Sequence, residues 1–398
     1  MNCGCVSKLP LLEYIRTLIT DTAALIISGN GKKATAMSEL ERLKKELCPD
    51  GVEFKPLGEV CEFKRGDAIT RQQTVPGEIP VIAGGQTPSY YHNKANRPGG
   101  TIAVSGSGAY AGFVSYWAIP IFLSDAFSVN PDVSRLSVKY VYYFLKNIQE
   151  QIYDVKRGGG VPHVYGSSIR HFLTPLPPLP VQREIVRILD KFAELIDILE
   201  QELVLRKKQY EYYRNRLLSF GGDVPAVTLG EVCGLFKGKQ LNKERLLKTG
   251  EYPAYNGGVS YSGFTGSYNV DENTTIISQG GASAGFVQFV ECKFWANAHC
   301  YYLKPNVEVI DNKYVFYFVK NNQAALMDFK YGAGIPALSS DKITNLSIPL
   351  PSLPVQRETV RILDKFTELI DVRGKELVLR KKQYEYYRDK LLVFKQLS

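Results

Sequence analysis

Two stretches of this sequence are nearly identical, and together they decide the fold. Residues 181–220 read VQREIVRILDKFAELIDILEQELVLRKKQYEYYRNRLLSF, and residues 355–394 read VQRETVRILDKFTELIDVRGKELVLRKKQYEYYRDKLLVF. They match at 31 of 40 positions without a gap. The chain of 398 residues is therefore an internal duplication, in which each near-identical block follows a more divergent one.

Each near-identical block has the pattern of a long helix. Its apolar residues recur at steps of four and three, the heptad pattern of a coiled coil. Proline-rich segments, PLPPLPVQRE (175–184) and IPLPSLPVQRE (348–358), introduce the two blocks and mark the helix starts. A helix of about 38 residues would be nearly 57 Å long at about 1.5 Å per residue. The predicted seam residues are Ile185, Leu189, Phe192, Ile196, Leu199 and Leu203 in the first block and Leu363, Phe366, Ile370 and Leu377 in the second.

A helix of this length needs a partner along it. We expect the two helices to pack against one another as an antiparallel coiled coil. In the second block Arg373 and Gly374 replace Leu199 and Glu200, and because glycine costs about 1 kcal/mol in a helix interior, a local bend is expected there. The alternative is that each helix packs only on its own domain.

The divergent blocks keep a common register at an offset of about 173 residues. LGEVC, FKRG/FKGK, IPVIAGG/YPAYNGG, SGSGAYAGFV/SQGGASAGFV and KYVYYFLK/KYVFYFVK occur in the same order in both. Short Val-, Ile-, Tyr- and Phe-rich runs broken by Gly, Pro, Asn and Ser predict mixed domains of short strands, with helices near residues 139–146 and 313–320. The predicted fold class is thus α+β, with two mixed domains separated by the coiled coil.

We expect five segments along the chain. Residues 1–50 form an N-terminal segment with a short helix at 37–47, and residues 1–36 match nothing in the repeat. Residues 51–174 form domain 1, residues 175–220 the first long helix, residues 221–347 domain 2, and residues 348–398 the second long helix.

Composition restricts the class of protein. Lys and Arg number 49 against 40 Asp and Glu, a formal net charge of +9 that makes a polyanionic partner plausible. The seven cysteines are an odd number without C-x-x-C spacing, which favours a reducing cytoplasm over a disulfide framework. The sequence has no stretch of eighteen consecutive apolar residues, so we predict no membrane-spanning helix. The first 28 residues lack signal-peptide features.

Several kinds of catalytic or cofactor site are not supported by the motifs. Gly106, Gly108 and Gly112 have G-x-G-x-x-x-G spacing, which does not fit a dinucleotide-binding loop, and GNGKK at residues 29–33 is not a phosphate-binding P-loop. The four histidines are scattered, and no serine lies in a G-x-S-x-G elbow. We therefore predict no catalytic residue and no metal site.

The duplicated arrangement resembles the specificity subunit of type I restriction-modification enzymes over about residues 50–394. The two LPVQRE junctions with their helices, LGEVC and AGFV carry the resemblance. It implies that each mixed domain is a target recognition domain reading one half of an asymmetric bipartite DNA site. It further implies that the helices set the spacing and bind two modification (methyltransferase) subunits, that restriction subunits join the complex, and that S-adenosylmethionine, ATP and Mg²⁺ belong to partners.

DNA contacts divide into cations for phosphates and polar or aromatic side chains for base edges. In domain 1 the candidates are Lys64, Arg65, Arg71, Lys94, Arg97, Lys156 and Arg157 for phosphates and Gln86, Tyr90, Tyr91, Ser107 and Tyr110 for bases. In domain 2 they are Lys237, Lys239, Lys243 and Lys330 for phosphates and Tyr255, Asn256, Tyr261, Gln279, Ser283 and Tyr331 for bases. Aligning FKRG with FKGK equates Lys64 with Lys237. For each lysine a solvated surface role, and for each tyrosine a core role, remains the alternative.

Other functions remain open on sequence alone. A non-catalytic scaffold whose two domains bind protein or carbohydrate would use the same architecture. An enzyme with its own nuclease or methyltransferase activity is a third possibility. Salt-dependent binding to duplex DNA separates DNA recognition from the scaffold, because phosphate contacts release counterions.

Overall fold

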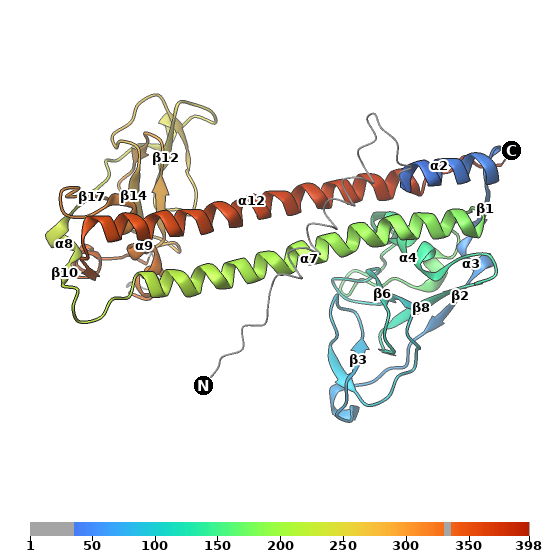
Figure 1. Cartoon of the computed structure of the whole chain (residues 1–398). Helices are drawn as coiled ribbons and strands as arrows, with labels where there is room; N and C mark the ends of the chain where they lie inside the picture. The colour runs from blue at the N-terminus through green and yellow to red at the C-terminus, as the bar shows by residue number, and fades with distance from the viewer. Residues whose placement is uncertain (1–35, 330–335, 398) are drawn as a thin grey trace, which may run out of the picture. The chain divides into compact units, whose positions relative to one another are not determined.

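A computed structural model describes residues 36–329 and 336–397. The chain forms two compact units, of which unit 1 takes residues up to 200 together with residues from 375 onward, and unit 2 takes residues 201–374. Each of the two long helices, α7 (Leu179–Leu217) and α12 (Leu353–Leu391), therefore contributes one part to each unit (Figure 1). Each unit also contains one of the two mixed domains.

Domain 1 is built from three small sheets. The largest is antiparallel, in the order β2-β8-β5-β6, and its strand β5 is buried along its whole length. A second sheet has the order β4-β3-β7, and β1 pairs with β9. The strands are β1 Glu53–Pro56, β2 Cys61–Arg65, β3 Ile79–Ile82, β4 Tyr90–His92, β5 Thr101–Ser105, β6 Val114–Trp117, β7 Phe122–Leu123, β8 Ala126–Pro131 and β9 Leu173–Leu176, and the helices are α3 Leu57–Val60, η1 Arg71–Gln73, α4 Val138–Asn147, α5 Gln149–Asp154 and α6 Gly166–Ile169.

Domain 2 repeats this topology. Its sheets have the orders β11-β17-β14-β15, β13-β12-β16 and β10-β18, which are the counterparts of those in domain 1. The elements are β10 Ala226–Thr228, α8 Leu229–Val232, β11 Cys233–Lys237, η2 Lys243–Arg245, β12 Tyr252–Tyr255, β13 Gly263–Thr265, β14 Thr274–Ser278, β15 Val287–Val290, β16 Trp295–Ala296, β17 Cys300–Pro305, α9 Asn312–Asn321, α10 Gln323–Asp328, α11 Ser340–Thr344 and β18 Ser347–Pro349. The divergent blocks thus share one fold.

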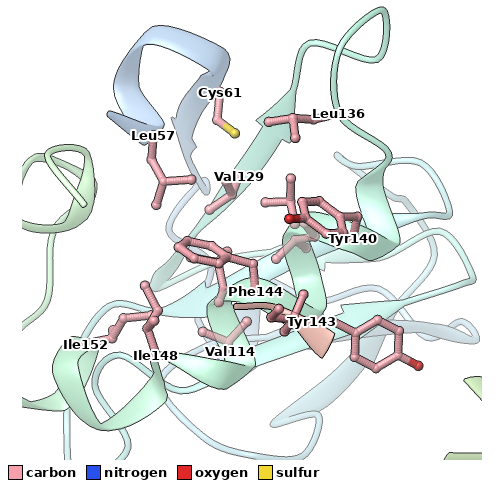
Figure 2. Close-up of a cluster of buried hydrophobic side chains, with 14 of the residues drawn as sticks. Leu57, Cys61, Val114, Val129, Leu136, Tyr140, Tyr143, Phe144, Ile148 and Ile152 are labelled. Carbon is pink, nitrogen blue, oxygen red and sulfur yellow. The ribbon is translucent and has the colours of Figure 1, made fainter. Parts of the chain in front are cut away.

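The core of domain 1 lies between α4 and the four-stranded sheet. Figure 2 shows Tyr140 and Phe144 of α4 directed into an interior shared with Val114 and Val129 of the sheet. In domain 2, Tyr314 and Phe318 of α9 are buried in the equivalent core. Both helices begin and end within a residue of the predicted positions, and Ser137 and Asp311 cap them by accepting a hydrogen bond from the backbone.

The long helices pair antiparallel within each unit, as predicted. In unit 1 the Phe192 ring near the start of α7 stacks on Tyr387 near the end of α12, with centroids 5.5 Å apart. In unit 2 Tyr213 near the end of α7 stacks on Phe366 near the start of α12, at 5.4 Å. All ten predicted seam residues are buried or half-buried. The start of α7 also joins the core of domain 1, so it packs on both its own domain and the other helix.

The weak point expected in α12 has a polar partner. Arg373 lies 3.6 Å from the carboxylate of Glu202 on α7, and Arg206 lies 3.3 Å from the same carboxylate. Glu202 is 8% exposed, so this charge is buried between cations. The helix continues through Gly374 without interruption.

Both ends of the described chain belong to unit 1. Helix α2 (Ala36–Leu47), which matches the predicted helix, buries Leu40, and Lys44 Nζ donates to the carbonyl of Leu391 at the end of α12. The backbone N–H of Val52 donates to the carbonyl of Lys395, and that of Leu397 donates to Val52. The final residues therefore pair with the entry into domain 1.

Candidate nucleic-acid interface

The edge strands β2 and β11 fix which residues of the two domains are equivalent. Arg65 lies opposite Phe127 at the end of β2, and Lys237 lies opposite Tyr301 at the end of β11. The next residue is a glycine in each case, and its N–H donates to the neighbouring strand in the same way. Arg65 is therefore the counterpart of Lys237, and Lys64 is the counterpart of Phe236.

This equivalence corrects the alignment of FKRG with FKGK. Both strands begin at a buried cysteine, Cys61 and Cys233, and counting from there moves the register by one residue. Side chains alternate between the two faces of a strand, so a shift of one residue moves a cation to the other face. The basic position that the two domains share is the exposed strand end occupied by Arg65 and Lys237.

A glycine-containing loop lies beside each of these strand ends. The loops at residues 105–112 and 278–285 make the same backbone hydrogen bonds, including Gly112 N to Ser105 O and Gly285 N to Ser278 O. Gly285 has φ +91 and an added Cβ would lie 2.7 Å from the backbone of Leu326, so glycine is required there. The repeated AGFV motif thus serves the fold.

A second loop pairs with the first. In domain 1 the backbone of Gly108 donates to Pro162, that of Val164 donates to Gly106, and Arg157 and His163 exchange two hydrogen bonds. The His163 ring stacks on Tyr165 at 5.9 Å. In domain 2 Gly281 donates to Pro336 and Leu338 donates to Gln279. Lys330 and Tyr331, which were predicted to contact DNA, lie outside the described residues.

Identical backbone positions on these loops carry different side chains in the two domains. Gly106 N donates to the carbonyl of Asp125, and Gln279 N donates to that of His299. We use "loop face" for the residues at these matched positions. They are Arg65, Gly106, Tyr110, Asp125 and His163 in domain 1 and Lys237, Gln279, Ser283, His299 and Ala337 in domain 2.

In domain 1 the loop face adjoins a cavity of about 930 Å³. Its lining includes the cations Arg65 and Arg170, the ring of His163, and the carboxylates of Glu59, Glu62, Asp125 and Asp132. The Ser107 hydroxyl donates to Asp125, so this predicted base reader has an intramolecular acceptor. The cavity therefore carries charges of both signs.

Most other predicted contacts of domain 1 are exposed. Tyr91 is 55% and Tyr110 46% exposed, and Tyr90 is half-buried with its hydroxyl donating to the carbonyl of Ile69. Lys156 is half-buried, with its ammonium 4.1 Å from the centre of the Tyr153 ring. The exposed cations and amide are Lys64, Arg65, Arg71, Gln86, Lys94 and Arg157.

Arg97 is a wrong prediction. Its side chain is buried, and its guanidinium donates to Ser128 Oγ at 3.0 Å and to the carbonyls of Arg65 at 2.7 Å and Asn96 at 2.8 Å. These bonds tie β2 to its neighbours and leave the cation unavailable to phosphate. At the equivalent position domain 2 has Val270, which is buried in the core.

In domain 2 the predicted phosphate contacts Lys237, Lys239 and Lys243 are exposed. Asn256 and Tyr261 are also exposed, and Ser283 is half-buried on the loop face. The prediction that Tyr255 reads a base is corrected. Its ring packs edge-on against buried Phe294 at 5.6 Å and contributes to a small core. Burial also raises the pKa of Tyr255.

Gln279 differs from its neighbours in having an incompletely satisfied side chain. Its Nε2 donates to the hydroxyl of Tyr301 at 3.0 Å. Its Oε1 is buried and makes no hydrogen bond within the described part of the chain. The amide is therefore held at its Nε2 end by Tyr301, beside the strand end that carries Lys237.

Comparison with known proteins identifies the fold. Residues 49–205 and 222–378 match the family of type I restriction modification DNA specificity domains, so both repeats are covered. The chain belongs to the type I DNA specificity family.

Relatives match the chain over most of their own length. It is 27% identical to a putative type I restriction enzyme specificity subunit of Haemophilus influenzae, covering 88% of this chain and 98% of that protein. It is 28% identical to the EcoR124I/EcoR124II specificity subunit of Escherichia coli, covering 90% and 98%. The solved S subunit from M. genitalium has the same fold, with a TM-score of 0.69 at 22% identity over 86% of this chain and 96% of that one.

The type I DNA specificity fold leaves a repeated apolar stripe exposed on the long helices. Val204, Leu205 and Tyr212 of α7 are 53%, 57% and 58% exposed, and their copies Val378, Leu379 and Tyr386 of α12 are 54%, 65% and 60% exposed. We call these two sets the exposed stripes. Our sequence reasoning missed them, although they were marked by apolar residues of ELVLRKKQYEYY that fall outside the heptad seam. Grouped exposed apolar residues mark interaction sites.

Neither a metal-ligand cluster nor a membrane-spanning helix occurs among the described residues. No group of three or more His, Cys, Asp or Glu side chains is placed to hold a metal ion in residues 36–329 and 336–397. Over the same ranges, neither long helix has a stretch apolar enough for a bilayer span.

Proposed function

We propose that this chain is the DNA-recognition subunit of a type I restriction-modification complex, and that each mixed domain reads one half of an asymmetric bipartite site. The observation that carries the proposal is the loop face. Two domains of one scaffold present a cation at the same strand end and different side chains at matched loop positions. A shared cation suits the uniform phosphate backbone, whereas differing side chains suit different base sequences.

Phosphate contact and base reading separate by residue. Arg65 and Lys237, supported by the exposed cations nearby, neutralise phosphates and supply affinity that does not depend on sequence. Gln279, Ser283 and Tyr110 approach base edges and supply discrimination. Because the two loop faces differ, the half-sites differ, and the recognised site is asymmetric.

The exposed stripes support binding of two copies of one partner. Val204, Leu205 and Tyr212 recur as Val378, Leu379 and Tyr386, so the helices offer the same apolar surface twice. We assign these surfaces to two modification (methyltransferase) subunits, which restriction subunits then join. Catalysis, with S-adenosylmethionine, ATP and Mg²⁺, belongs to those partners.

The test uses the full chain assembled with its methyltransferase. Its affinity for duplex DNA is measured between about 50 and 200 mM salt, and methylated adenines are mapped genome-wide with and without the gene. We expect a steep linear fall of log affinity with log salt and loss of one bipartite methylated motif on deletion. Affinity that does not respond to salt, together with an unchanged methylome, would contradict the proposal and favour the protein- or carbohydrate-binding scaffold.

A further inference from the structure

Each recognition domain is fastened to its long helix by the same three side chains. In unit 1 Lys139 Nζ and the Tyr143 hydroxyl, both on α4, each donate to the carboxylate of Asp190 on α7, at 2.6 Å. In unit 2 Lys313 donates to Asp364 on α12 at 3.1 Å, and the Tyr317 hydroxyl donates to it at 2.6 Å. We call these two sets, Lys139–Tyr143–Asp190 and Lys313–Tyr317–Asp364, the junction triads.

A buried glutamine fixes the other end of each junction. The Gln182 side chain is completely buried, accepts a hydrogen bond from Ser137 N at 2.8 Å and donates to the carbonyls of Arg135 and Pro177. Gln356 accepts from Asp311 N and donates to the carbonyls of Val309 and Pro351. Glutamine and aspartate are eight residues apart in each helix, a separation of about 12 Å along the axis.

Two separated polar attachments restrict rotation in a way that apolar packing does not. Ile185 and Leu189, which lie between Gln182 and Asp190, are completely buried against domain 1, but hydrophobic contact is not directional. Hydrogen bonds require defined distances and angles. With one polar attachment at the helix start and a second two turns later, the domain cannot turn about the helix without breaking one of them.

The tyrosine is a dependable donor in each triad. Burial, followed by the hydrogen bond to Asp190, raises the pKa of Tyr143 well above that of a free phenol, and the same causes act on Tyr317. Both hydroxyls therefore keep their protons at neutral pH and donate to the carboxylate.

We propose that the junction triads are positioning residues that fix the angle of each recognition domain on its helix, and so restrict the complex to DNA sites with one spacing between half-sites. The inference rests on the proposed function. The triads touch neither loop face, since their atoms lie on α4, α9 and the long helices. They act through the orientation of the domain on its helix. They recur in both units, although the loop-face residues differ.

The test uses the full chain, in complex with its methyltransferase, carrying Asp190→Asn, Asp364→Asn or Tyr143→Phe. Binding is measured on duplexes that contain the methylated motif with its natural spacer and with spacers one and two base pairs longer or shorter. For Asp190→Asn we expect affinity for the natural spacer to fall about five- to tenfold, the effect of losing one half-exposed charge-assisted hydrogen bond. Affinity for the altered spacers should fall less, so that the preference for the natural spacer over the altered ones decreases. Asp364→Asn should act in the same direction.

Controls separate positioning from mere stability. Lys365→Gln on α12 removes an exposed surface ion pair with Glu368 and should leave every spacer unaffected. Tyr143→Phe removes a single hydroxyl, and it gives the same readout if Asp190→Asn does not fold. Equal loss on all spacers, or no loss, would overturn the positioning role. Failure of the wild-type complex to bind any of these duplexes would instead overturn the proposed function.

Discussion

Arg65 and Lys237 occupy the same place in the two recognition domains, each as the last residue of the edge strand and each followed by a glycine that bonds to the neighbouring strand. A cation at this point is therefore part of the shared scaffold.

We expect Arg65→Ala and Lys237→Ala each to weaken binding to all DNA sequences alike. Each should reduce the slope of log affinity against log salt by about 1, the value for one lost phosphate contact. Equilibrium binding to a random duplex and to the methylated motif at several salt concentrations measures both effects. Lys64→Ala is the matched control, because the Lys64 side chain lies on the opposite face of β2 from that of Arg65. A larger change of slope for Lys64→Ala than for Arg65→Ala would refute the assignment.

Gln279→Ala should change sequence preference in one half-site. Loss of a base contact removes about 1–3 kcal/mol of discrimination at one base pair. Sequencing the methylated sites selected from a randomised duplex library should show relaxed preference in the second half-site only. Gln240→Ala, an exposed glutamine of the same domain, is the control. Uniform weakening on every sequence would show that Gln279 does not read a base.

Gln182→Ala and Gln356→Ala should destabilise their own units. Each removes the buried acceptor of a backbone N–H and the donor to two carbonyls, and a buried polar group left unpaired costs about 1–3 kcal/mol. Urea unfolding followed by fluorescence should show the loss in one transition, with the other unit less affected. Gln151→Ala, on the exposed side of α5, should change the free energy of unfolding little. Equal stability of Gln182→Ala and Gln151→Ala would contradict the hydrogen-bond account.

Cysteine alkylation should follow burial. Burial raises the pKa of Cys61, Cys233 and Cys300 to about 12, so at pH 8 only about one in ten thousand of these thiols is ionised. Cys292 is exposed. Treatment of the native chain with iodoacetamide at pH 8 and mass spectrometry of its peptides should show, among the cysteines of residues 36–329, Cys292 modified first and the three buried thiols only in denaturant. Rapid native labelling of Cys61 would indicate that the core of domain 1 is open.

Leu205→Asp and Leu379→Asp should each remove one bound methyltransferase. A charge in an apolar interface is left desolvated and unpaired, which disfavours docking. Native mass spectrometry should show two partner subunits on the wild-type chain, one on each single variant and none on the double variant. Val307→Asp places the same charge at a 67% exposed turn of domain 2 and serves as control. Retention of two methyltransferase subunits by the double variant would show that the exposed stripes are not the binding surfaces.

The repeat and the heptad seam were predictable because both depend on local spacing. The burial of Arg97 could not be predicted, because its hydrogen-bond acceptors include the carbonyl of Arg65, which only the folded sheet brings close. The sequence alignment of β2 with β11 was wrong by one residue. It matched FKRG with FKGK, whereas the strand pairing in each domain makes Cys61 equivalent to Cys233 and therefore Arg65 equivalent to Lys237. The junction triads were also beyond sequence reasoning, since Lys139 and Asp190 are 51 residues apart and neither charge looks unusual alone.

The pairing of Val52 with the last residues of the chain has a consequence for synthesis. Unit 2 is contiguous, and all of its residues have been made once the ribosome has passed position 374. Unit 1 needs Leu391 and Leu392 in its core and Lys395 beside Val52, so its core cannot be completed until these residues have been made. Domain 1, which is translated first, therefore depends on residues made after those of unit 2, and a chain truncated after residue 374 should hold domain 2 folded and domain 1 incomplete.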